Sequence, residues 1–347
     1  MRSSFLRGGL VLLFAVSIGA AIGAAAPPEG GYHLIKKVTL GGEGFWDYLK
    51  VDSDARRLYI SRGTHVMVVD ADNYSVVGDI PDTQGVHGIA IAPEFGRGFT
   101  SNGRTANVTI FDLKTLKVLG TAATDQGPDA IIYDPASKRV FTFNGRGGSA
   151  TAIDAATGNV VGTIKLDGRP EFAVPDGKGH IYNNLEDKSM IVEIDSQALK
   201  VTQRWPLAPG EEPSGIAMDT EHRRLFSGCH NKMMAVVDAD SGKVVATPPI
   251  GEGVDANGFD SGTGLAFSSN GDGTLTVVHA ESPDKYTVVE NVKTQRGART
   301  MALDEKTHNV FLVTAEFEPP PLRGAQPGGG RRPTMKPGTF TLLVFGK

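Results

Sequence analysis

Residues 66–80, VMVVDADNYSVVGDI, hold an alternating apolar run that ends in an aspartate, then a short polar turn and a second apolar run. The same plan returns in VTIFDLKTLKVLGTA (108–122), ATAIDAATGNVVGTI (150–164), MIVEIDSQALKVTQRW (190–205) and MAVVDADSGKVVATPPI (234–250). Successive copies lie 42, 42, 41 and 43 residues apart, as counted between Asp70, Asp112, Asp154, Asp195 and Asp238. Alternation predicts half-buried strands, so each copy is expected to form a β-hairpin within a long repeat.

A second pair of strands is expected between these hairpins. A polar turn joins two short apolar runs in YLKVDSDARRLYIS (48–61), GIAIAPEFGRGFTS (88–101), AIIYDPASKRVFTF (130–143), GIAMDTEHRRLFSG (215–228) and TMALDEKTHNVFLV (300–313). Each period thus supplies four short antiparallel strands, which is typical of a β-propeller blade. The 44 glycines and 20 prolines, spread along the chain, also favour many strands and tight turns over a helical solenoid.

The length of the chain predicts a closed ring. Residues 32–347 without the insertion 318–338 leave 295 residues, or about seven periods of 42. The last repeat supplies three strands, the third in TFTLLVFG (339–346), and the N-terminal HLIKKVTL (33–40) can supply the fourth. We therefore expect an all-β protein, a seven-bladed β-propeller over residues 32–347 whose last blade is completed by the N-terminal strand, which removes exposed sheet edges.

The N-terminus reads as an export signal over residues 1–26. Arg2 and Arg7 precede an almost wholly apolar run from Leu10 to Ile22, and small residues follow it. An uncleaved membrane anchor is the alternative, but the run is short for a spanning helix. No later segment is long and apolar enough to span a membrane, so we expect a periplasmic or secreted monomer.

The net charge limits the kinds of partner that the protein can bind, and the cysteine content limits how the fold can be stabilised. The formal charge of −4 becomes −6 when the two signal arginines are removed, which disfavours nucleic acid as a partner. Cys229 is the only cysteine, so no intrachain disulfide can form and the core must hold the fold.

The repeat resembles the YVTN β-propeller repeat family, the YncE-like exported proteins. The resemblance rests on apolar runs ending in Asp, on ATGNVVG (156–162), and on the following glycine- and proline-marked strand starts such as GPDAII (127–132). The tetrapeptide that names the family is replaced by YISR, FTSN, FTFN and IYNN. The resemblance implies a propeller and an extracytoplasmic location. It implies no single activity, because propellers of this kind include binding platforms and lactonase-like or lyase-like enzymes.

One residue per blade is expected at the mouth of the central channel. In a four-stranded blade the turn before the first strand and the turn between the second and third strands emerge on the same face. Aligning the blades on the end of their first strands predicts a ring made of Asp47, His87, Asp129, Glu171, Ser214, Asp255 and Arg299. These residues would either cap turns around a water-filled tunnel or bind a polar ligand or cation.

The turns between second and third strands add a second ring. Its asparagines are interpreted as turn formers that tolerate left-handed backbone, whereas Arg62, Arg104 and Arg146 have no such role in a turn. In FNGRGGSATAID (143–154) the glycines precede a strand, so no helix N-terminus exists to bind phosphate. Arg104 and Arg146 are left as candidate anion contacts beside the channel.

Chemical motifs do not single out an activity. The G-x-S-x-G, H-E-x-x-H and C-x-x-C patterns are all absent from the sequence. No cofactor is indicated and no metal is firmly indicated, although a divalent cation could be held by carboxylates converging from several blades. The insertion 318–338 is rich in Pro, Gly and Arg, and is either a solvated loop or a basic arm over the same face.

The sequence therefore predicts a binding or scaffold propeller with a mainly acidic channel-mouth face for a small polar ligand or a protein partner. The alternative is a metal-assisted hydrolase or lyase that uses the channel-mouth carboxylates and His87. A polyanion binder acting through the basic insertion is the third and weakest option, because the mature chain is acidic.

Overall fold

The computed structural model describes residues 1, 30–42, 44–318 and 334–347. Residues 32–347 form one compact unit. The predicted signal segment 1–26 and most of the insertion 318–338 lie outside the described residues. In the part of the chain that is described, no helix is long and apolar enough to cross a membrane.

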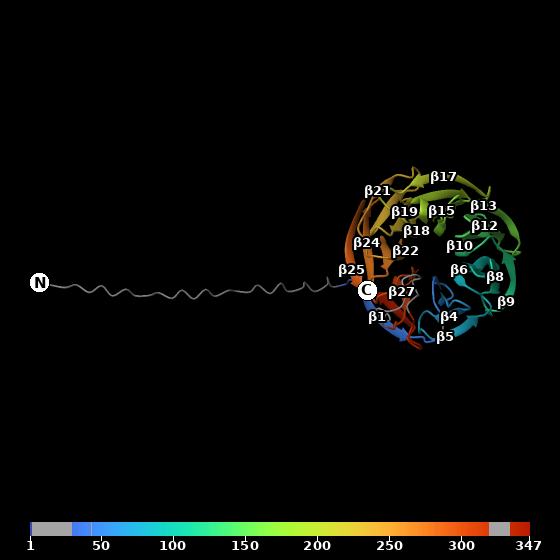
Figure 1. Cartoon of the computed structure of the whole chain (residues 1–347), viewed down its shortest axis with the longest axis horizontal. Helices are drawn as coiled ribbons and strands as arrows, with labels where there is room; N and C mark the ends of the chain where they lie inside the picture. The colour runs from blue at the N-terminus through green and yellow to red at the C-terminus, as the bar shows by residue number, and fades with distance from the viewer. Residues whose placement is uncertain (2–29, 43, 319–333) are drawn as a thin grey trace, which may run out of the picture. The chain divides into compact units, whose positions relative to one another are not determined.

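Seven four-stranded antiparallel sheets are arranged as blades around a central axis (Figure 1). Blade 1 consists of β2 (Leu49–Asp52), β3 (Arg57–Ser61), β4 (Val66–Asp70) and β5 (Val76–Ile80). Blade 2 consists of β6 (Val86–Ala92), β7 (Arg97–Asn102), β8 (Asn107–Asp112) and β9 (Val118–Ala123). Blade 3 consists of β10 (Pro128–Asp134), β11 (Arg139–Asn144), β12 (Ser149–Asp154) and β13 (Val160–Lys165). Blades 4 and 5 consist of β14 (Pro170–Pro175), β15 (His180–Leu185), β16 (Met190–Asp195) and β17 (Lys200–Pro206); and β18 (Pro213–Asp219), β19 (Arg224–Cys229), β20 (Met233–Asp238) and β21 (Val244–Ala246).

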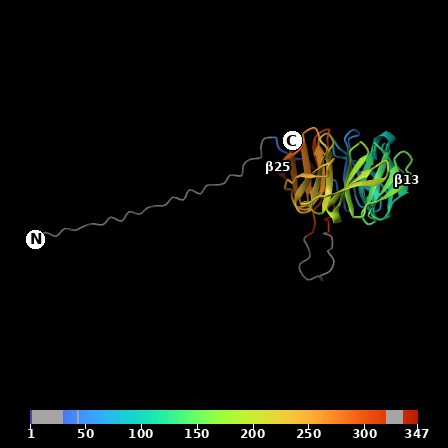
Figure 2. The same cartoon turned by 90° about the horizontal axis from the view of Figure 1, so that it is seen from above.

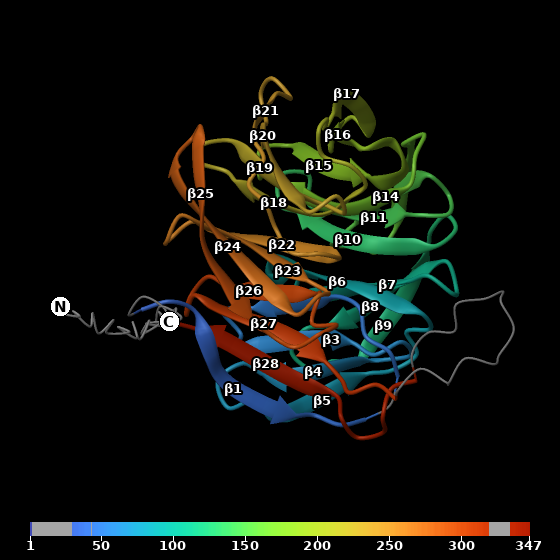
Figure 3. The same cartoon turned by 60° about the vertical axis from the view of Figure 1, so that its left-hand side comes forward.

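Blade 6 consists of β22 (Val254–Asp260), β23 (Leu265–Asn270), β24 (Thr274–Ser282) and β25 (Lys285–Lys293). Blade 7 is assembled from both ends of the unit: β26 (Met301–Asp304), β27 (Asn309–Thr314), β28 (Thr341–Gly346) and β1 (His33–Thr39). Figure 3 shows β1 alongside β28, with which it pairs antiparallel. The predicted fold and its closure by the N-terminal strand are confirmed.

The hydrophobic core consists of seven clusters, each shared by two neighbouring blades. One cluster joins blade 7 to blade 1 through Phe311 and Leu342 on one side and Leu58 and Ile60 on the other. Viewed from the side, the blades stand next to one another as layers (Figure 2). Burial of apolar area between every pair of neighbours therefore closes the ring without a disulfide.

The repeated aspartates have a local role. Asp70 Oδ1 accepts hydrogen bonds from the backbone N–H groups of Asp72 and Asn73, both at 2.9 Å. Asp112, Asp195 and Asp238 accept the same pair of bonds in their own turns. Each aspartate ends the third strand of its blade by satisfying the turn backbone, which explains its spacing in the sequence.

Candidate functional site

The predicted ring residues lie at one end of the innermost strands. These strands, β2, β6, β10, β14, β18, β22 and β26, contact one another in that order and wall the channel. Asp47 and Arg299 lie two residues before β2 and β26, and the other ring residues are the second residue of their strands. The structure thus places all seven on the same edge of the ring.

Five ring residues lie in breaks of strand pairing. The register between the first and second strands shifts between Val86 and Ile89 in blade 2, and equivalent shifts flank the ring residue in blades 3 to 6. A bulge leaves its extra residue unpaired and bends the strand, so the side chain is turned away from the regular alternation. The residues turned in this way are His87, Asp129, Glu171, Ser214 and Asp255.

Buried polar side chains of the second strands hold these bulges. Asn183 Nδ2 donates to the carbonyls of Glu171 (2.8 Å) and Phe172 (3.1 Å). Asn184 Nδ2 donates to the carbonyls of Ser214 (2.8 Å) and Gly215 (3.1 Å). The interpretation of the second-ring asparagines as left-handed turn formers was wrong, because no asparagine among the described residues has a positive φ. At least two of them fix the backbone that carries the ring residues.

Three ring residues from blades 1, 2 and 3 are in contact. His87 Nδ1 lies 2.6 Å from Asp47 Oδ2 and 3.5 Å from Asp129 Oδ1. One ligand atom from each of the three residues can be chosen so that all lie within 4.8 Å of one another. Their side chains remain 22 to 36% exposed, so the cluster is open to a ligand from solvent.

Further carboxylates surround the same hollow, which has a volume of about 180 Å³. Glu171 and Asp255 line it from blades 4 and 6, and Glu186 lines it from a 3₁₀ turn after β15. The Arg299 guanidinium lies 3.6 Å from Asp255 Oδ1, and Glu186 is paired with Arg169. Five carboxylates therefore face this space, and Arg299 is the arginine among its described lining residues. His87 contacts Asp47 and Asp129 but is not among those lining residues.

An aromatic pair forms part of this hollow. The rings of Tyr48 and Phe172 stack with centroids 4.3 Å apart. Tyr48 Oη and Asp255 Oδ2 line the hollow, and both oxygens are buried with no hydrogen-bond partner within the described structure. A buried polar atom without a partner is costly, so these two oxygens mark places where a ligand or water would be stabilised.

The crowding of carboxylates raises their pKa values. Burial raises the pKa of Glu171 to about 9, and the neighbouring Asp129 and Glu186 add to the rise. Burial raises the pKa of Asp255 to about 7 although Arg299 opposes the shift. Burial also raises the pKa of Asp129 to about 6, against the charge of His87. The folded site therefore takes up protons near neutral pH, and a bound cation would take the place of those protons.

The predicted arginines do not join the cluster. Arg146 donates to the carbonyl of Gly103 at 3.2 Å, and the exposed Arg104 follows that glycine; neither lines the hollow. Arg62 is fully buried and has a structural role: it donates to the carbonyls of Gly41 (3.0 Å) and Gly44 (3.1 Å). The position of an arginine in a turn does not indicate whether its side chain is buried or exposed to solvent.

Glu186 lines the hollow but was not predicted from the sequence. It lies two positions after the last residue of the IYNN segment, and the short 3₁₀ turn from Glu186 to Lys188 places it at the channel mouth. His230, which follows β19, also lines the hollow, and its Nδ1 lies 3.8 Å from Glu212 Oε2. In the sequence, the one sign that Glu186 could reach the channel is that the turn between β15 and β16 differs from the tight turns at the same position in blades 2 and 3.

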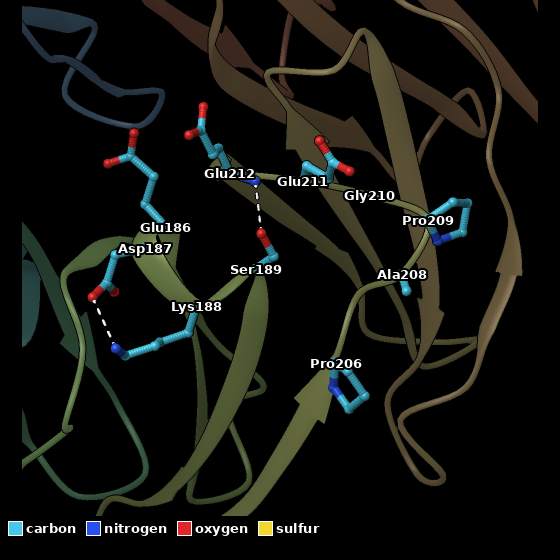
Figure 4. A pocket seen from close by; sticks show the side chains of 10 residues that line it. All are labelled: Glu186, Asp187, Lys188, Ser189, Pro206, Ala208, Pro209, Gly210, Glu211 and Glu212. Atoms are coloured by element: carbon cyan, nitrogen blue, oxygen red, sulfur yellow. Dashed lines mark hydrogen bonds and ion pairs between the residues drawn. The ribbon is translucent and has the colours of Figure 1, made fainter.

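A larger open hollow of about 510 Å³ adjoins the channel mouth through Glu186. Its acidic side chains are Glu186, Asp187, Glu211 and Glu212, with Lys188 as its only basic side chain. Figure 4 shows Glu186 and Glu212 extending on the same side, with the Glu212 backbone N–H bonded to Ser189 Oγ at 3.0 Å. The acidic surface thus continues from the channel mouth along blades 4 and 5. We call this second hollow the acidic groove.

No protein-family model matches the sequence, and no curated protein matches it either. Solved structures do match. The RRP9 WD40 repeats align with a TM-score of 0.75 at 8% identity, covering 92% of this chain and 98% of that chain. A chain of the mitotic checkpoint complex aligns with a TM-score of 0.72 at 14% identity, covering 88% and 95%. The hydrazine synthase of Kuenenia stuttgartiensis aligns with a TM-score of 0.66 at 14% identity, covering 85% and 96%. At these identities the likeness shows a shared fold, and this chain is a seven-bladed β-propeller with WD40-like neighbours.

Proposed function

We propose that this protein is an exported binding propeller whose channel mouth holds a cationic group, carried by a small polar ligand or by a basic segment of a protein partner. The observation that supports it is the convergence of five carboxylates from four blades on one small hollow. Burial and, to a smaller extent, repulsion from neighbouring carboxylates raise the pKa values of Glu171 and Asp255, and a ligand cation would stabilise their ionised forms. The acidic groove offers a path for the chain that carries the cation.

The binding test uses spermidine and short lysine- and arginine-containing peptides as probes. We expect these probes to bind the wild-type protein and to bind Glu171→Gln and Asp255→Asn at least about tenfold more weakly, because each variant removes a carboxyl group that would ionise beside a bound cation. Asp54→Asn is the matched control, since Asp54 is 98% exposed and paired only with Lys306. Equal affinity for basic and acetylated-lysine peptides would show that the hollow does not select for charge.

The enzyme alternative has its own support. Asp129 and Asp255 have pKa values raised by burial to about 6 and about 7, so both can hold or release a proton near neutral pH, and Asp129 does so beside His87. A metal-assisted hydrolase or lyase would use them with Asp47 and Glu171. A panel of lactones and activated esters tests this: turnover that His87→Gln abolishes supports an enzyme, and no turnover with or without added Zn²⁺ or Mn²⁺ rejects that class of substrate.

Export is proposed on the N-terminal sequence alone, and the resemblance to the YVTN family agrees with it. Expression of the full chain followed by N-terminal sequencing of the periplasmic fraction should find a new terminus near Ala26. Retention of residues 1–26 on cytoplasmic protein would contradict export. Size-exclusion chromatography with light scattering of the same sample tests the proposed monomer.

A further inference from the structure

The contact among Asp47, His87 and Asp129 has the composition of a metal site. It offers one imidazole nitrogen and two carboxylate oxygens, from three adjacent blades. Metal–ligand bonds of about 2.0–2.2 Å place neighbouring ligand atoms roughly 3 Å apart. The observed separations of 2.6 Å and 3.5 Å from His87 Nδ1 lie on either side of that spacing. Small side-chain movements would therefore bring all three atoms to bonding distance of one ion.

We propose that Asp47 Oδ2, His87 Nδ1 and Asp129 Oδ1 bind one divalent transition-metal ion, of the Zn²⁺ or Mn²⁺ class, at the channel mouth. The assignment rests on the proposed function, because it adds a metal ion to the cationic groups that the acidic channel mouth is proposed to hold. An imidazole ligand favours transition metals over Ca²⁺ and Mg²⁺, which prefer sites made of oxygen atoms. The three residues are held by separate innermost strands, so the ion would also link blades 1, 2 and 3.

A second observation points to a ligand in the same place. Asp255 and Tyr48 line the hollow together with Asp47 and Asp129, and their Oδ2 and Oη atoms are buried without a hydrogen-bond partner in the described structure. Three protein ligands leave at least one coordination position open, and a water or ligand atom in that position can reach such oxygens. The two oxygens without partners would thus form hydrogen bonds to the water or ligand atom bound at the open position of the metal ion.

The experiment is metal titration of chelator-stripped protein that carries no histidine tag. Isothermal titration calorimetry with Zn²⁺ and Mn²⁺, and with Ca²⁺ for comparison, should give one site per chain for the transition metals and weaker or no binding of Ca²⁺. His87→Gln and Asp129→Asn should each weaken binding at least about tenfold. Absorption of the Co²⁺-loaded protein should report nitrogen ligation that His87→Gln removes.

His230→Gln is the matched control, because His230 lines the same hollow but is not one of the three ligands. If His230→Gln weakens metal binding as much as His87→Gln, the three-residue assignment is wrong. Thermal unfolding of each metal-free variant shows whether it is folded, and Asp47→Asn replaces any variant that is not.

The same samples separate this inference from the proposed function. Binding of spermidine to the metal-free protein without any binding of Zn²⁺ or Mn²⁺ would overturn the metal site and leave the cationic-ligand function standing. Absence of both would overturn both. Binding of metal at one site that all three ligand variants keep would place the ion elsewhere and overturn the assignment.

Discussion

Tyr48 and Phe172 stack at 4.3 Å although they belong to blades 1 and 4, which lie on opposite sides of the ring. The pair therefore joins opposite walls of the channel, and both residues line the same hollow as the carboxylates. Its two rings also pack against different core clusters, Tyr48 against the one between blades 3 and 4 and Phe172 against the ones between blades 4 and 5 and between blades 6 and 7. A contact across the axis restricts the shape of the hollow more than contacts between neighbours could.

Phe172→Ala should destabilise the protein by about 2 to 4 kcal/mol, because it removes a large ring from two core clusters and leaves Tyr48 without its partner. Tyr48→Phe keeps the stack and removes a buried hydroxyl that has no partner, so its stability should equal or exceed that of the wild type. Urea unfolding of both variants measures the difference. Equal destabilisation by the two substitutions would show that the hydroxyl, not the ring contact, matters.

Gly103 fixes the position of the His87 ring. A Cβ at residue 103 would lie 2.8 Å from His87 Nε2, closer than real contacts allow, and 3.3 Å from the carbonyl oxygen of Pro128, which is a tight contact. Gly103→Ala should displace His87 from Asp47 and weaken binding of cations at the channel mouth about tenfold. Gly145→Ala is the control at the equivalent position of blade 3, where the nearest atom is 3.8 Å away. If both variants bind cations as the wild type does, the imidazole has room to move.

The repeat explains why so much of the fold could be predicted. A period of 42 residues with one aspartate per turn sets the blade and its register, and the register alone placed Asp47, His87 and Asp129 on one edge of the ring. Contacts between blades carry no such period. The stack of Tyr48 on Phe172 joins residues 124 positions apart, and no repeat pattern relates one to the other.

The burial of the arginines is another property that the repeat pattern does not predict. Arg62 and Arg104 both occur in turns between second and third strands, yet one is fully buried and the other is exposed. The difference arises from Phe340, whose ring lies 3.6 Å from the Arg62 guanidinium, and from the carbonyls of Gly41 and Gly44. These partners come from the segments that flank the closure of the ring, which a comparison of regular repeats leaves out.

Arg62→Met should therefore destabilise the ring without changing the site. The substitution leaves the carbonyls of Gly41 and Gly44 without their donor and removes a cation from the face of Phe340, a loss on the order of 2 kcal/mol or more. Arg104→Met, at an exposed position, should leave the melting temperature unchanged. Differential scanning calorimetry measures both, and spermidine binding checks the site. A loss of affinity in folded Arg62→Met protein would show that Arg62 also contributes to ligand binding.

The raised pKa values predict how stability depends on pH. The folded protein holds the Glu171 proton up to about pH 9 and the Asp255 proton up to about pH 7, whereas the unfolded chain releases them near the ordinary values of 4.5 and 3.8. The folded state therefore binds more protons between these limits, so these two groups make stability fall as pH rises from about 4.5 to 9. Below about pH 4 the opposite holds for Asp112, Asp154, Asp195 and Asp238, whose pKa values are lowered, in part by the bonds they accept in their turns.

Glu171→Gln removes one of the two titrating groups from the neutral range. The variant should be more stable than the wild type above about pH 8, by on the order of 1 kcal/mol, and its melting temperature should fall less between pH 5 and pH 9. The melting curves are recorded with a chelator present, and Glu211→Gln, on the exposed rim of the acidic groove, is the control. Identical slopes for wild type and Glu171→Gln would mean that Glu171 is ionised in the folded protein and that the hollow is less crowded with charge than the geometry indicates. The melting temperature of Glu171→Gln, but not that of Glu211→Gln, should depend less on pH than that of the wild type. If added spermidine removes this difference between Glu171→Gln and the wild type, the bound cation replaces the proton that Glu171 holds.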